Sequence, residues 1–359
     1  MAIKYIQIAK QLKDFIIESN RNISYKLPTE AELCTRFSAS RQTIRQALAI
    51  LEKENYIYKK QGSGIYTIPL LSSLASKKIN ILISDDCEYT NPSFISSLQK
   101  QLKEQHLTLN IFQTNWDFNQ ERQHLLSMLG ENIYALYIEG NKTGFQNPNL
   151  DLYQQLENKG TKLILINSPK LPLNNATYIN IDNYQGGYTL TKHLISLGRR
   201  KVACVMPDFI QEAKDRYAGF QAAFRDANLH IPDNNVYGYS VTDLQLLRNR
   251  RDTSFISSYI NHGIWKYDCV ICYNDEIAYW LIKELSIAKI AVPEQLSIAS
   301  FDNSYLSTLG KISLSSMSLP PNEPAASAAN ILFNYLYEKE TLDVLLHWDF
   351  VPRNSIQPL

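Results

Sequence analysis

The sequence predicts two folding units: a small α+β helix-turn-helix unit with a wing, followed by a larger α/β unit of two lobes built on parallel sheets. Three observations support this fold class. The chain has 359 residues, which is long for one hydrophobic core. Its first 70 residues combine helical periods with turn signals, whereas short apolar strands alternate with helical stretches from Ile79 onward. We therefore expect domains at residues 1–69 and 78–359, joined by a linker at 70–77.

Charge divides the chain in the same way. Residues 1–70 hold 11 Lys and Arg against 6 Asp and Glu, whereas the remaining residues hold 25 against 29. A basic small unit joined to a mildly acidic large one is typical of a DNA-binding head on a sensor body. No apolar run approaches the roughly 20 residues that cross a bilayer. Lys10, Lys13 and Asp14 interrupt the stretch where a signal peptide would be apolar, so we expect a cytoplasmic protein with no membrane partner.

The five cysteines are scattered and odd in number, which argues against a disulfide framework. Cys269 and Cys272 are spaced like half of a zinc site, but no second pair accompanies them. Residues 267–273 have the pattern of a strand whose two cysteines point to opposite faces. The histidines are dispersed, and no nucleophile elbow, P-loop or His-Glu-x-x-His sequence is present. We expect no metal, no cofactor and no catalytic residue.

Two helices are expected near the N-terminus. The first covers residues 4–19, where apolar side chains recur at helical spacing: Ile6, Ala9, Leu12, Phe15 and Ile16. The second begins at Pro28 and ends near Phe37. Thr29 can cap its free amides, and Glu32, three residues later, completes a capping box.

Ser40 is the predicted cap of a third helix, whose inner face carries Ile44, Ala47, Leu48 and Leu51. Two capped helices joined by a tight turn form a helix-turn-helix. The first turn of the third helix bears side chains that can read a major groove, since arginine pairs with guanine and glutamine with adenine. These side chains are Arg41, Gln42, Thr43 and Arg45.

A hairpin is expected after the third helix. Residues 56–60 and 65–68 have the composition of two strands, and Gln61-Gly62-Ser63-Gly64 lies between them. A glycine tip lets such a wing approach the DNA backbone closely. Because the glycine pair opens a strand and not a helix, it is not a dinucleotide-binding fingerprint.

Three stretches of this unit resemble the winged-helix head of the gluconate-repressor (GntR) family: LPTEAEL at 27–33, SRQTIRQAL at 40–48 and QGSG at 61–64. The resemblance covers residues 1–70 and implies double-stranded operator DNA as a partner. In that family the matching arginines and the residue before the glycine tip contact DNA. The resemblance therefore assigns DNA contacts to Arg41, Gln42, Thr43, Arg45, Gln61 and Gly62, with Lys4 and Tyr5 at positions that commonly touch phosphates.

The larger unit alternates strands with helices. Predicted strands lie at 79–84, 109–113, 135–139, 162–167, 178–181, 201–206, 269–273 and 297–301. Predicted helices between them include 92–105, 184–197 and 276–285. This alternation predicts open parallel sheets with helices on both faces, and about 280 residues suit two such lobes.

Ligands of open α/β sheets bind beyond the carboxyl ends of the strands, so polar residues directly after predicted strands are the site candidates. Arg216 joins them because it begins a predicted helix. Carboxylates, amides and an arginine around one cleft suit a polyhydroxylated ligand, since a bidentate partner can hold each pair of neighbouring hydroxyls. Any one of these residues could instead cap a helix, as Asn274 and Asp275 illustrate. The candidates are Tyr89, Glu139, Lys142, Asp182, Arg216, Asn274, Asp275 and Asp302, with Asn91 and Asn303 beside them.

Several stretches of this unit resemble the effector domain of the lactose/galactose-repressor family, which has a periplasmic-binding-protein-like fold: DNYQGG at 182–187, RYAGF at 216–220, VICYNDEIA at 270–278 and VPEQLSIASFDN at 292–303. The resemblance extends from about Lys78 to the C-terminus. It implies that Arg216, Asn274 and Asp302 touch sugar hydroxyls, with Asp182 nearby. The family usually has two aspartates where this chain has Asp302 and Asn303, so the role is carried only to Asp302.

A gluconate-repressor head on a lactose-repressor-type body resembles the L-arabinose-responsive repressors of Gram-positive bacteria. The resemblance implies a homodimer that binds a pseudo-palindromic operator and is released by L-arabinose. The residues themselves leave another sugar or a sugar phosphate open. Gly186 and Gly187 near a helix start could bind a phosphate or could let the helix pack closely on its neighbours. A sugar-uptake protein shares the two-lobed fold, but it needs a secretion signal and has no helix-turn-helix.

Overall fold

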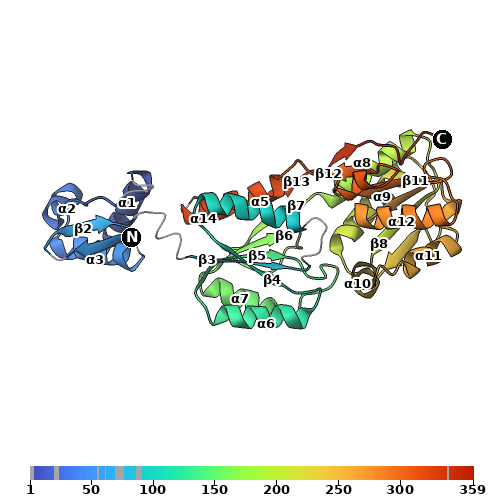
Figure 1. The fold of residues 1–359 in the computed structure, drawn as a ribbon. Coiled ribbons are helices and arrows are strands. Elements are labelled where there is room, and N and C mark those ends of the chain that lie inside the picture. The colour runs from blue at the N-terminus through green and yellow to red at the C-terminus, as the bar shows by residue number, and fades with distance from the viewer. Residues whose placement is uncertain are drawn as a thin grey trace. The chain divides into compact units, whose positions relative to one another are not determined.

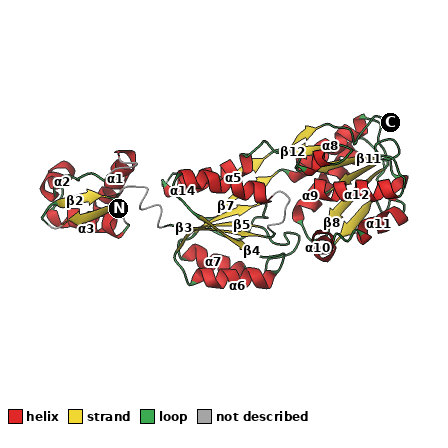
Figure 2. Cartoon of the chain, in the orientation of Figure 1, coloured by secondary structure: helices red, strands yellow, loops and turns green. Residues whose placement is uncertain are grey.

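The computed structural model describes residues 4–19, 24–54, 56–60, 62–68, 77–85, 91–337 and 339–359. These residues form an N-terminal head and a larger body (Figure 1). Figure 2 shows the head as helices with one small hairpin, and the body as two sheets with helices on their faces. Of the predicted linker at 70–77, only Lys77 belongs to the described residues.

The head folds around one apolar core. Its elements are α1 (Lys4–Ser19), α2 (Glu30–Phe37), α3 (Arg41–Lys53), β1 (Ile57–Lys60) and β2 (Gly64–Thr67). Leu12, Leu33 and Leu48 are buried in this core. Two residues of the predicted apolar face of α1 are exposed, because the buried stripe runs through Ile8 instead; they are Ile6 and Phe15.

The helix starts in the head follow the predicted caps. The Thr29 side chain accepts from the Glu32 amide at 3.3 Å, and the Glu32 carboxylate accepts from the Thr29 amide at 2.7 Å, which completes the capping box of α2. Ser40 Oγ accepts from the Thr43 amide at 3.2 Å and caps α3. Between the two helices, Ser38 adopts a left-handed conformation with φ of 47° and produces the tight turn.

The described residues of the body form two six-stranded sheets with the same arrangement of strands. The first lobe has the order β13-β7-β6-β5-β3-β4, and the second has β14-β12-β11-β10-β8-β9. In the first lobe the strands are β3 (Lys78–Ile83), β4 (Leu109–Gln113), β5 (Ile133–Glu139), β6 (Lys162–Ile166), β7 (Thr177–Ile181) and β13 (Val344–Leu346). In the second lobe they are β8 (Val202–Pro207), β9 (Val236–Tyr239), β10 (Cys269–Cys272), β11 (Ser297–Phe301), β12 (Ser315–Ser318) and β14 (Asp349–Val351).

The neighbouring strands from β13 to β5 in the first lobe and from β12 to β9 in the second pair in parallel, whereas β14 runs antiparallel to β12. In each sheet the second strand pairs on one side of the first strand, and the later strands are added on the other side. The strand order therefore reverses between β3 and β5 in the first lobe and between β8 and β10 in the second. Such a reversal leaves a crevice at the carboxyl ends of the strands, which is where ligands bind in this class of sheet.

Helices cover both faces of each sheet, as predicted. In the first lobe, α5 and α14 lie on one face and α6 and α7 on the other (Figure 1). These helices are α5 (Asn91–Glu104), α6 (Phe118–Leu129), α7 (Leu150–Asn158) and α14 (Glu323–Leu336). The second lobe contains α8 (Asn183–Ser196), α9 (Gln211–Asp226), α10 (Val241–Arg250), α11 (Ser254–Asn261), α12 (Asp275–Ile287), α13 (Leu306–Leu309) and a 3₁₀ turn (Ile264–Lys266).

The chain passes between the lobes at three places within the described residues: from β7 into α8, from β12 into α14, and from β13 into β14. The contact of α14 with the first lobe is anchored by the Tyr137 hydroxyl, which donates to Ala328 O at 2.9 Å. Because the lobes exchange elements in this way, neither lobe is a continuous stretch of sequence.

Close packing of α8 on α9 depends on two glycines. A Cβ at Gly187 would lie 2.0 Å from Arg216 O, and one at Gly219 would lie 2.0 Å from Tyr184 O. No side chain fits at either position. Of the two alternatives for Gly186-Gly187, the structure therefore favours helix packing over phosphate binding for Gly187, and the same contact fixes the place of Arg216.

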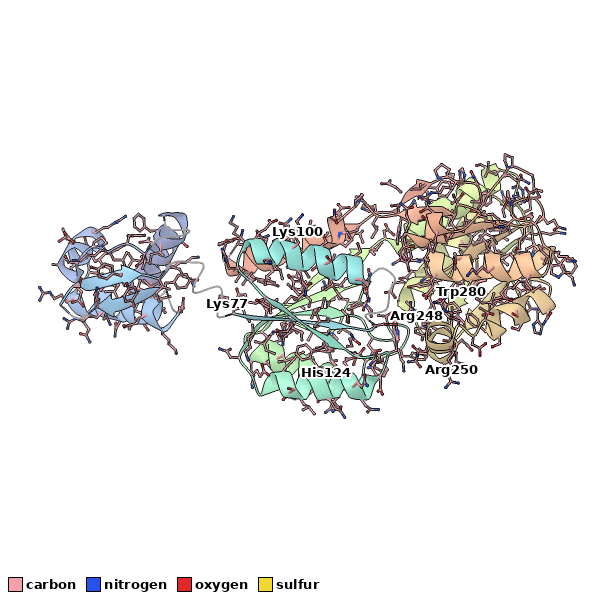
Figure 3. All side chains as sticks on the ribbon, in the orientation of Figure 1. Lys77, Lys100, His124, Arg248, Arg250 and Trp280 are labelled. Carbon is pink, nitrogen blue, oxygen red and sulfur yellow. The ribbon has the colours of Figure 1, made fainter. Side chains whose placement is uncertain are left out.

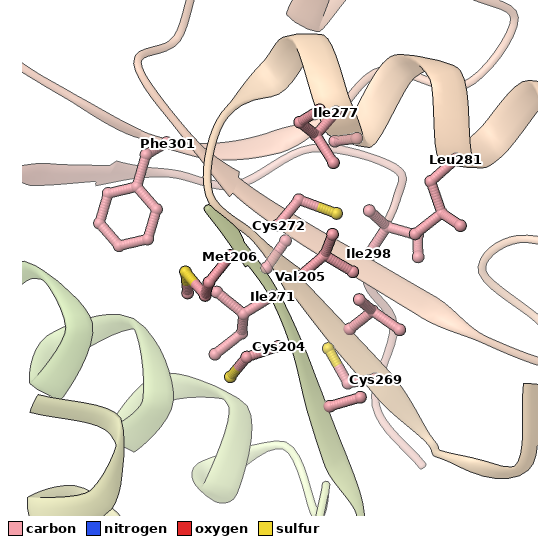
Figure 4. Close-up of a cluster of buried hydrophobic side chains, with 14 of the residues drawn as sticks. Cys204, Val205, Met206, Cys269, Ile271, Cys272, Ile277, Leu281, Ile298 and Phe301 are labelled. Atoms are coloured by element: carbon pink, nitrogen blue, oxygen red, sulfur yellow. The ribbon is translucent and has the colours of Figure 1, made fainter. Parts of the chain in front are cut away.

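The interior of the second lobe is apolar and contains three of the cysteines. Figure 4 shows Cys204, Cys269 and Cys272 among aliphatic side chains of the neighbouring strands and of α12. All three are free thiols and fully buried. Burial raises the pKa of the Cys204 and Cys269 thiols above the usual range. They pack as small apolar side chains, in agreement with the strand predicted at Cys269.

One helix start was predicted wrongly. The sequence predicted that Arg216 begins a helix, whereas α9 already begins at Gln211. Its cap residue, Ile210, makes no side-chain cap hydrogen bond, so the local sequence carries no start signal. In the described part of the chain, no helix is both long enough and apolar enough to cross a membrane.

Candidate functional site

A cavity of about 560 Å³ lies in the body between the two lobes, a volume that suits a small-molecule ligand. Residues at or just beyond the carboxyl ends of the strands line it, on both sides of each point where the sheet order reverses. The first lobe contributes Asp85 after β3 and Glu139 at the end of β5. The second lobe contributes Asn274 after β10 and Asp302 after β11.

Four of the eight predicted site residues line this cavity: Glu139, Arg216, Asn274 and Asp302. Asn91 and Asn303, which were named beside the candidates, line it as well. Three others do not appear in its lining. Asp182 caps α8 by accepting from the Gln185 amide at 2.9 Å. Lys142 has a φ of 45°, and its ammonium lies 5.5 Å from the centre of the Phe118 ring.

Asp275 is the third candidate outside the lining, and it is fully buried. Its carboxylate accepts from the Ser316 hydroxyl at 2.8 Å and from the Ser304 amide at 2.7 Å. Burial raises the pKa of this carboxyl to about 6, helped by the nearby Asp302 charge. These contacts hold the segment after β11, next to the cavity. Tyr89, the remaining candidate, lies outside the described residues.

Arg216 is the most constrained polar side chain of the cavity, with an exposed fraction of 5%. Its Nε donates to Asn183 Oδ1 at 2.9 Å, and Nη1 donates to Tyr273 O. The guanidinium carbon lies 4.1 Å from the centre of the Phe301 ring and 5.1 Å from that of Trp348. Stacking and hydrogen bonding together leave the remaining N–H groups aimed in a fixed direction.

Asp302 faces Arg216, with 3.9 Å between Oδ1 and the arginine Nη2. Its backbone φ is 92°, a value that side chains rarely adopt. Strained residues of this kind persist when the surrounding structure enforces them, and they concentrate at ligand sites. Arg216 and Asp302 thus present a donor and an acceptor side by side, the arrangement that binds two neighbouring hydroxyls.

Among the described residues that line the cavity, carboxyl groups outnumber cations. Burial raises the pKa of the Glu139 carboxyl, although hydrogen bonds from the Ser84 amide and the Asn91 side chain oppose the shift. Burial also raises the pKa of Glu212 to about 7, against the effect of the Thr143 hydroxyl. The Glu212 carboxyl can therefore hold a proton in the neutral pH range and act as a hydrogen-bond donor as well as an acceptor.

Three buried polar atoms around the cavity have no hydrogen-bond partner among the described residues: Trp116 Nε1, Asn167 Oδ1 and Trp348 Nε1. Buried groups are nearly always paired, because leaving one unpaired costs about 1–3 kcal/mol. The described residues around the cavity thus include two donors and one acceptor without partners, and Trp116 packs edge-on against Phe209 and Trp348 against Phe301.

Several cavity residues were not among the predicted candidates. Glu212 lies one helical turn before Arg216, so the spacing i, i+4 could have signalled a shared face. Asp85 follows β3 directly and satisfies the strand-end rule that selected the other candidates. Arg248 comes from the last turn of α10 and Trp348 from the crossover between β13 and β14, and no local pattern marks them.

In the head, the described residues among the predicted DNA contacts lie at the start of α3, on the wing and at the start of α1. Arg41, Gln42 and Arg45 are exposed on α3, and the Thr43 hydroxyl lies 2.8 Å from that of Ser40. Arg45 Nε donates to both carboxylate oxygens of Glu30, at 3.0 and 3.1 Å.

Gly62 is exposed at the tip of the wing, with a φ of 72° and open space where a Cβ would lie. Lys4 donates to Ser38 O at 2.7 Å, and Tyr5 packs partly against the core of the head. Gln61 lies outside the described residues.

Comparison with known proteins separates the same two parts. Residues 4–67 match the family of bacterial regulatory proteins named gntR, and residues 191–356 match the periplasmic binding protein-like domain. The chain is a DNA-binding transcription regulator. Its head has the gntR type of helix-turn-helix, and its body has the fold of the sugar-binding domain in lactose-repressor-type regulators, as the sequence predicted.

Two curated relatives match the regulator over nearly its whole length. One is the "Arabinose metabolism transcriptional repressor" of Geobacillus stearothermophilus, 28% identical over 99% of this chain and 98% of the relative. The other has the same name and comes from Halalkalibacterium halodurans, with 29% identity over 96% of this chain and 92% of the relative. Both relatives are repressors, and neither name describes an enzyme.

Solved structures match the body of the regulator in fold. A LacI family transcriptional regulator from Enterococcus faecium with bound ribose has a TM-score of 0.64 and 23% identity, covering 79% of this chain and all of that one. A periplasmic binding protein/LacI regulator from Alkaliphilus metalliredigens, complexed with D-xylulofuranose, has a TM-score of 0.65 and 20% identity, covering 78% and 99%. At these identities the match establishes the fold of the body.

Proposed function

We propose that the regulator represses arabinose-utilisation genes, binds its operator through the head, and releases it when L-arabinose occupies the cavity of the body. The main support for a sugar-binding site is the cavity itself, where Arg216 and Asp302 lie side by side near unpaired indole N–H groups. L-arabinose as the effector is supported by the two full-length relatives whose names refer to arabinose metabolism.

The charge of the cavity favours a neutral sugar over a sugar phosphate. Its lining includes four carboxyl groups and two guanidinium groups: Asp85, Glu139, Glu212, Asp302, Arg216 and Arg248. Both arginines already face carboxylates, Arg216 that of Asp302 and Arg248 those of Asp85 and Glu276. A phosphate dianion would meet net repulsion there, whereas sugar hydroxyls can donate to the carboxylates.

We propose that sugar and operator act on the regulator by linkage. A homodimer in the cytoplasm would place two heads on the half-sites of a pseudo-palindromic operator. Sugar binds more tightly when both lobes contact it, so it favours the arrangement of the lobes described here. Coupling of this kind typically changes affinity at the other site by about 1–3 kcal/mol, and the effect is reciprocal. No catalytic step is part of the proposal.

Calorimetric titration of the purified full-length protein tests the effector assignment. The panel contains L-arabinose, D-xylose, D-ribose, D-galactose and the 5-phosphates of arabinose and ribose. We expect L-arabinose to bind most tightly and the phosphates not to bind. Preferred binding of a phosphate would contradict the charge argument, and absence of binding by any sugar would contradict the proposed function of the cavity.

A further inference from the structure

We propose that Thr143 and Gly144, in the loop after β5 of the first lobe, hold the cavity closed by capping helix α9 of the second lobe, so that Thr143 is a positioning residue for the effector site. The inference rests on the proposed function, because it takes the cavity to be where the effector binds. It assigns a role to a loop that contains no predicted contact with sugar except Lys142.

The first turn of α9 receives its cap from the other lobe. Helix N-termini leave backbone amides without intrahelical partners, and a Ser, Thr, Asp or Asn side chain just before the helix usually binds one. Ile210 occupies that position in α9 and provides no such side chain. The Gln211 amide donates instead to Thr143 Oγ1 at 2.9 Å, across the boundary between the lobes. Thr143 is buried there, with an exposed fraction of 7%.

The same hydroxyl also fixes a carboxyl group that lines the cavity. Thr143 Oγ1 donates to Glu212 Oε2 at 2.6 Å while it accepts from the Gln211 amide. A hydroxyl has one proton to donate and two lone pairs, so both bonds can exist at once. Glu212 precedes Arg216 by one turn, and both line the cavity. Thr143 therefore positions the helix that carries Arg216.

Gly144 brings the two backbones into contact beside this cap. Its amide donates to Phe209 O at 2.9 Å, and its carbonyl accepts from Lys214 Nζ at 2.9 Å. A Cβ on Gly144 would lie 2.8 Å from the Phe209 carbonyl carbon and 2.9 Å from its oxygen. Contacts that short do not occur, so any side chain at Gly144 would push the lobes apart.

A buried carboxylate of the first lobe fixes the conformation of the loop after β5. Glu121 has an exposed fraction of 1% and accepts from Asn141 Nδ2 at 2.8 Å, Asn147 Nδ2 at 2.7 Å and the Tyr153 hydroxyl at 2.6 Å. These bonds lie within the first lobe and do not depend on the second. The loop is therefore presented to α9 in a fixed conformation, which lowers the entropy cost of forming the cap.

Because the cap joins the lobes, its bonds form only when the lobes are close. An effector that needs both lobes gains affinity from every bond that favours the closed arrangement. Removing the hydroxyl should thus weaken sugar binding although Thr143 itself need not touch the sugar.

Thr143→Val removes the hydroxyl at nearly constant shape, and Thr143→Ser keeps it. In calorimetric titration we expect Val to weaken L-arabinose binding about tenfold, the usual effect of losing a cap, and Ser to stay within about threefold of the parent. Thr308→Val, at an exposed position of α13, is the matched control and should change nothing. Unchanged binding by Thr143→Val, or an equal loss in Val and Ser, would overturn the proposal.

Gly144→Ala tests the close approach separately. We expect a larger loss of sugar affinity than in Thr143→Val, since the added methyl group prevents closure. Gly238→Ala is its control, because a Cβ at Gly238 meets nothing within 4 Å. Equal affinities of the two alanine variants would contradict the assigned role of Gly144.

Amide hydrogen exchange gives a readout that does not depend on the identity of the effector. In the full-length protein, Thr143→Val should exchange faster than the parent at the Gln211 amide, and Thr143→Ser should not. If the parent protein binds no sugar of the panel, the proposed function fails. The exchange rates of the Gln211 amide in the parent and in the Thr143 variants still test whether the cap forms. Identical exchange in the parent protein and Thr143→Val, both with and without sugar, would overturn the cap.

Discussion

The guanidinium of Arg216 and the carboxylate of Asp302 face each other across 3.9 Å in the cavity of the body, one from the second turn of α9 and the other from the end of β11. Arg216 is held by stacking and hydrogen bonds, and Asp302 is held in a left-handed backbone conformation. The pair is close enough to share a ligand with neighbouring hydroxyls and too far apart for a direct hydrogen bond.

Arg216→Ala should abolish the response to sugar while leaving operator binding intact. Loss of a buried charged donor typically costs about 2–5 kcal/mol of affinity, which corresponds to a Kd at least about thirtyfold higher. The measurement is an operator mobility-shift assay with increasing L-arabinose. Arg250→Ala serves as control, because Arg250 is exposed on α10, whereas Arg248 on the same helix lines the cavity (Figure 3). Retained induction in Arg216→Ala would contradict the site assignment.

Asp302→Gly and Asp302→Ala should both lose sugar affinity but should differ in stability. The φ of 92° is accessible to glycine and strained for alanine, so the glycine variant should be more stable by about 1 kcal/mol. Thermal unfolding and calorimetric titration on the same samples separate the two effects. Equal melting temperatures would show that the backbone is not strained at this position in solution.

Arg45→Ala should lose operator affinity and keep sugar affinity. An arginine that reads a base edge contributes about 1–3 kcal/mol, so operator binding should weaken by roughly tenfold or more. Fluorescence anisotropy with a labelled operator measures the operator affinity, and calorimetry with L-arabinose measures the sugar affinity of the body. Lys53→Ala, at the exposed C-terminal end of α3, is the matched control. Equal operator affinities of the two variants would exclude Arg45 from the DNA contact.

Arg248 should couple to Asp85 in a double-mutant cycle. The guanidinium of Arg248 contacts the Asp85 carboxylate in the first lobe and the Glu276 carboxylate at 2.6 Å in its own lobe. We expect Arg248→Gln and Asp85→Asn each to weaken L-arabinose binding about tenfold, and the double variant to be less affected than the sum predicts. Strictly additive losses would contradict an ion pair that acts on lobe closure.

Glu212→Gln should change how stability depends on pH. Burial raises the pKa of Glu212 to about 7 from an ordinary value of 4.5, so the folded state binds the proton more tightly than the unfolded state. The stability that this proton contributes is full below pH 4.5 and is lost as pH rises toward 7 and beyond, by on the order of 3 kcal/mol. The glutamine variant should therefore melt at a higher temperature than the parent at pH 8, and this gain should vanish near pH 5. A constant difference between pH 5 and pH 8 would contradict the shifted pKa.

Much of the fold could be predicted because its signals are local. Thr29 and Ser40 cap the helices that their sequence context indicates, and the strand at Ser297–Phe301 has the predicted bounds. The start of α9 could not be predicted, since its cap comes from Thr143, 68 residues earlier in the chain. The residues next to the start of α9 do not indicate such a contact.

The candidate site was predictable where the strand-end rule applies. It selected Glu139, Asn274 and Asp302, which line the cavity. It also selected Asp275, whose carboxylate accepts hydrogen bonds from serines and does not line the cavity. Position after a strand does not say which way a side chain points, and a capping side chain satisfies the same pattern. Arg248 reaches the cavity only through the packing of α10.

The proposed function requires above all that a neutral sugar bound in the body releases the head from DNA. Fluorescence anisotropy of a labelled operator, titrated with L-arabinose in the presence of the full-length protein, tests it most directly. We expect the operator to be released at sugar concentrations near the calorimetric Kd, and Arg216→Ala to stay bound throughout. Sugar that binds the body while the operator stays bound to the parent protein would contradict the claim.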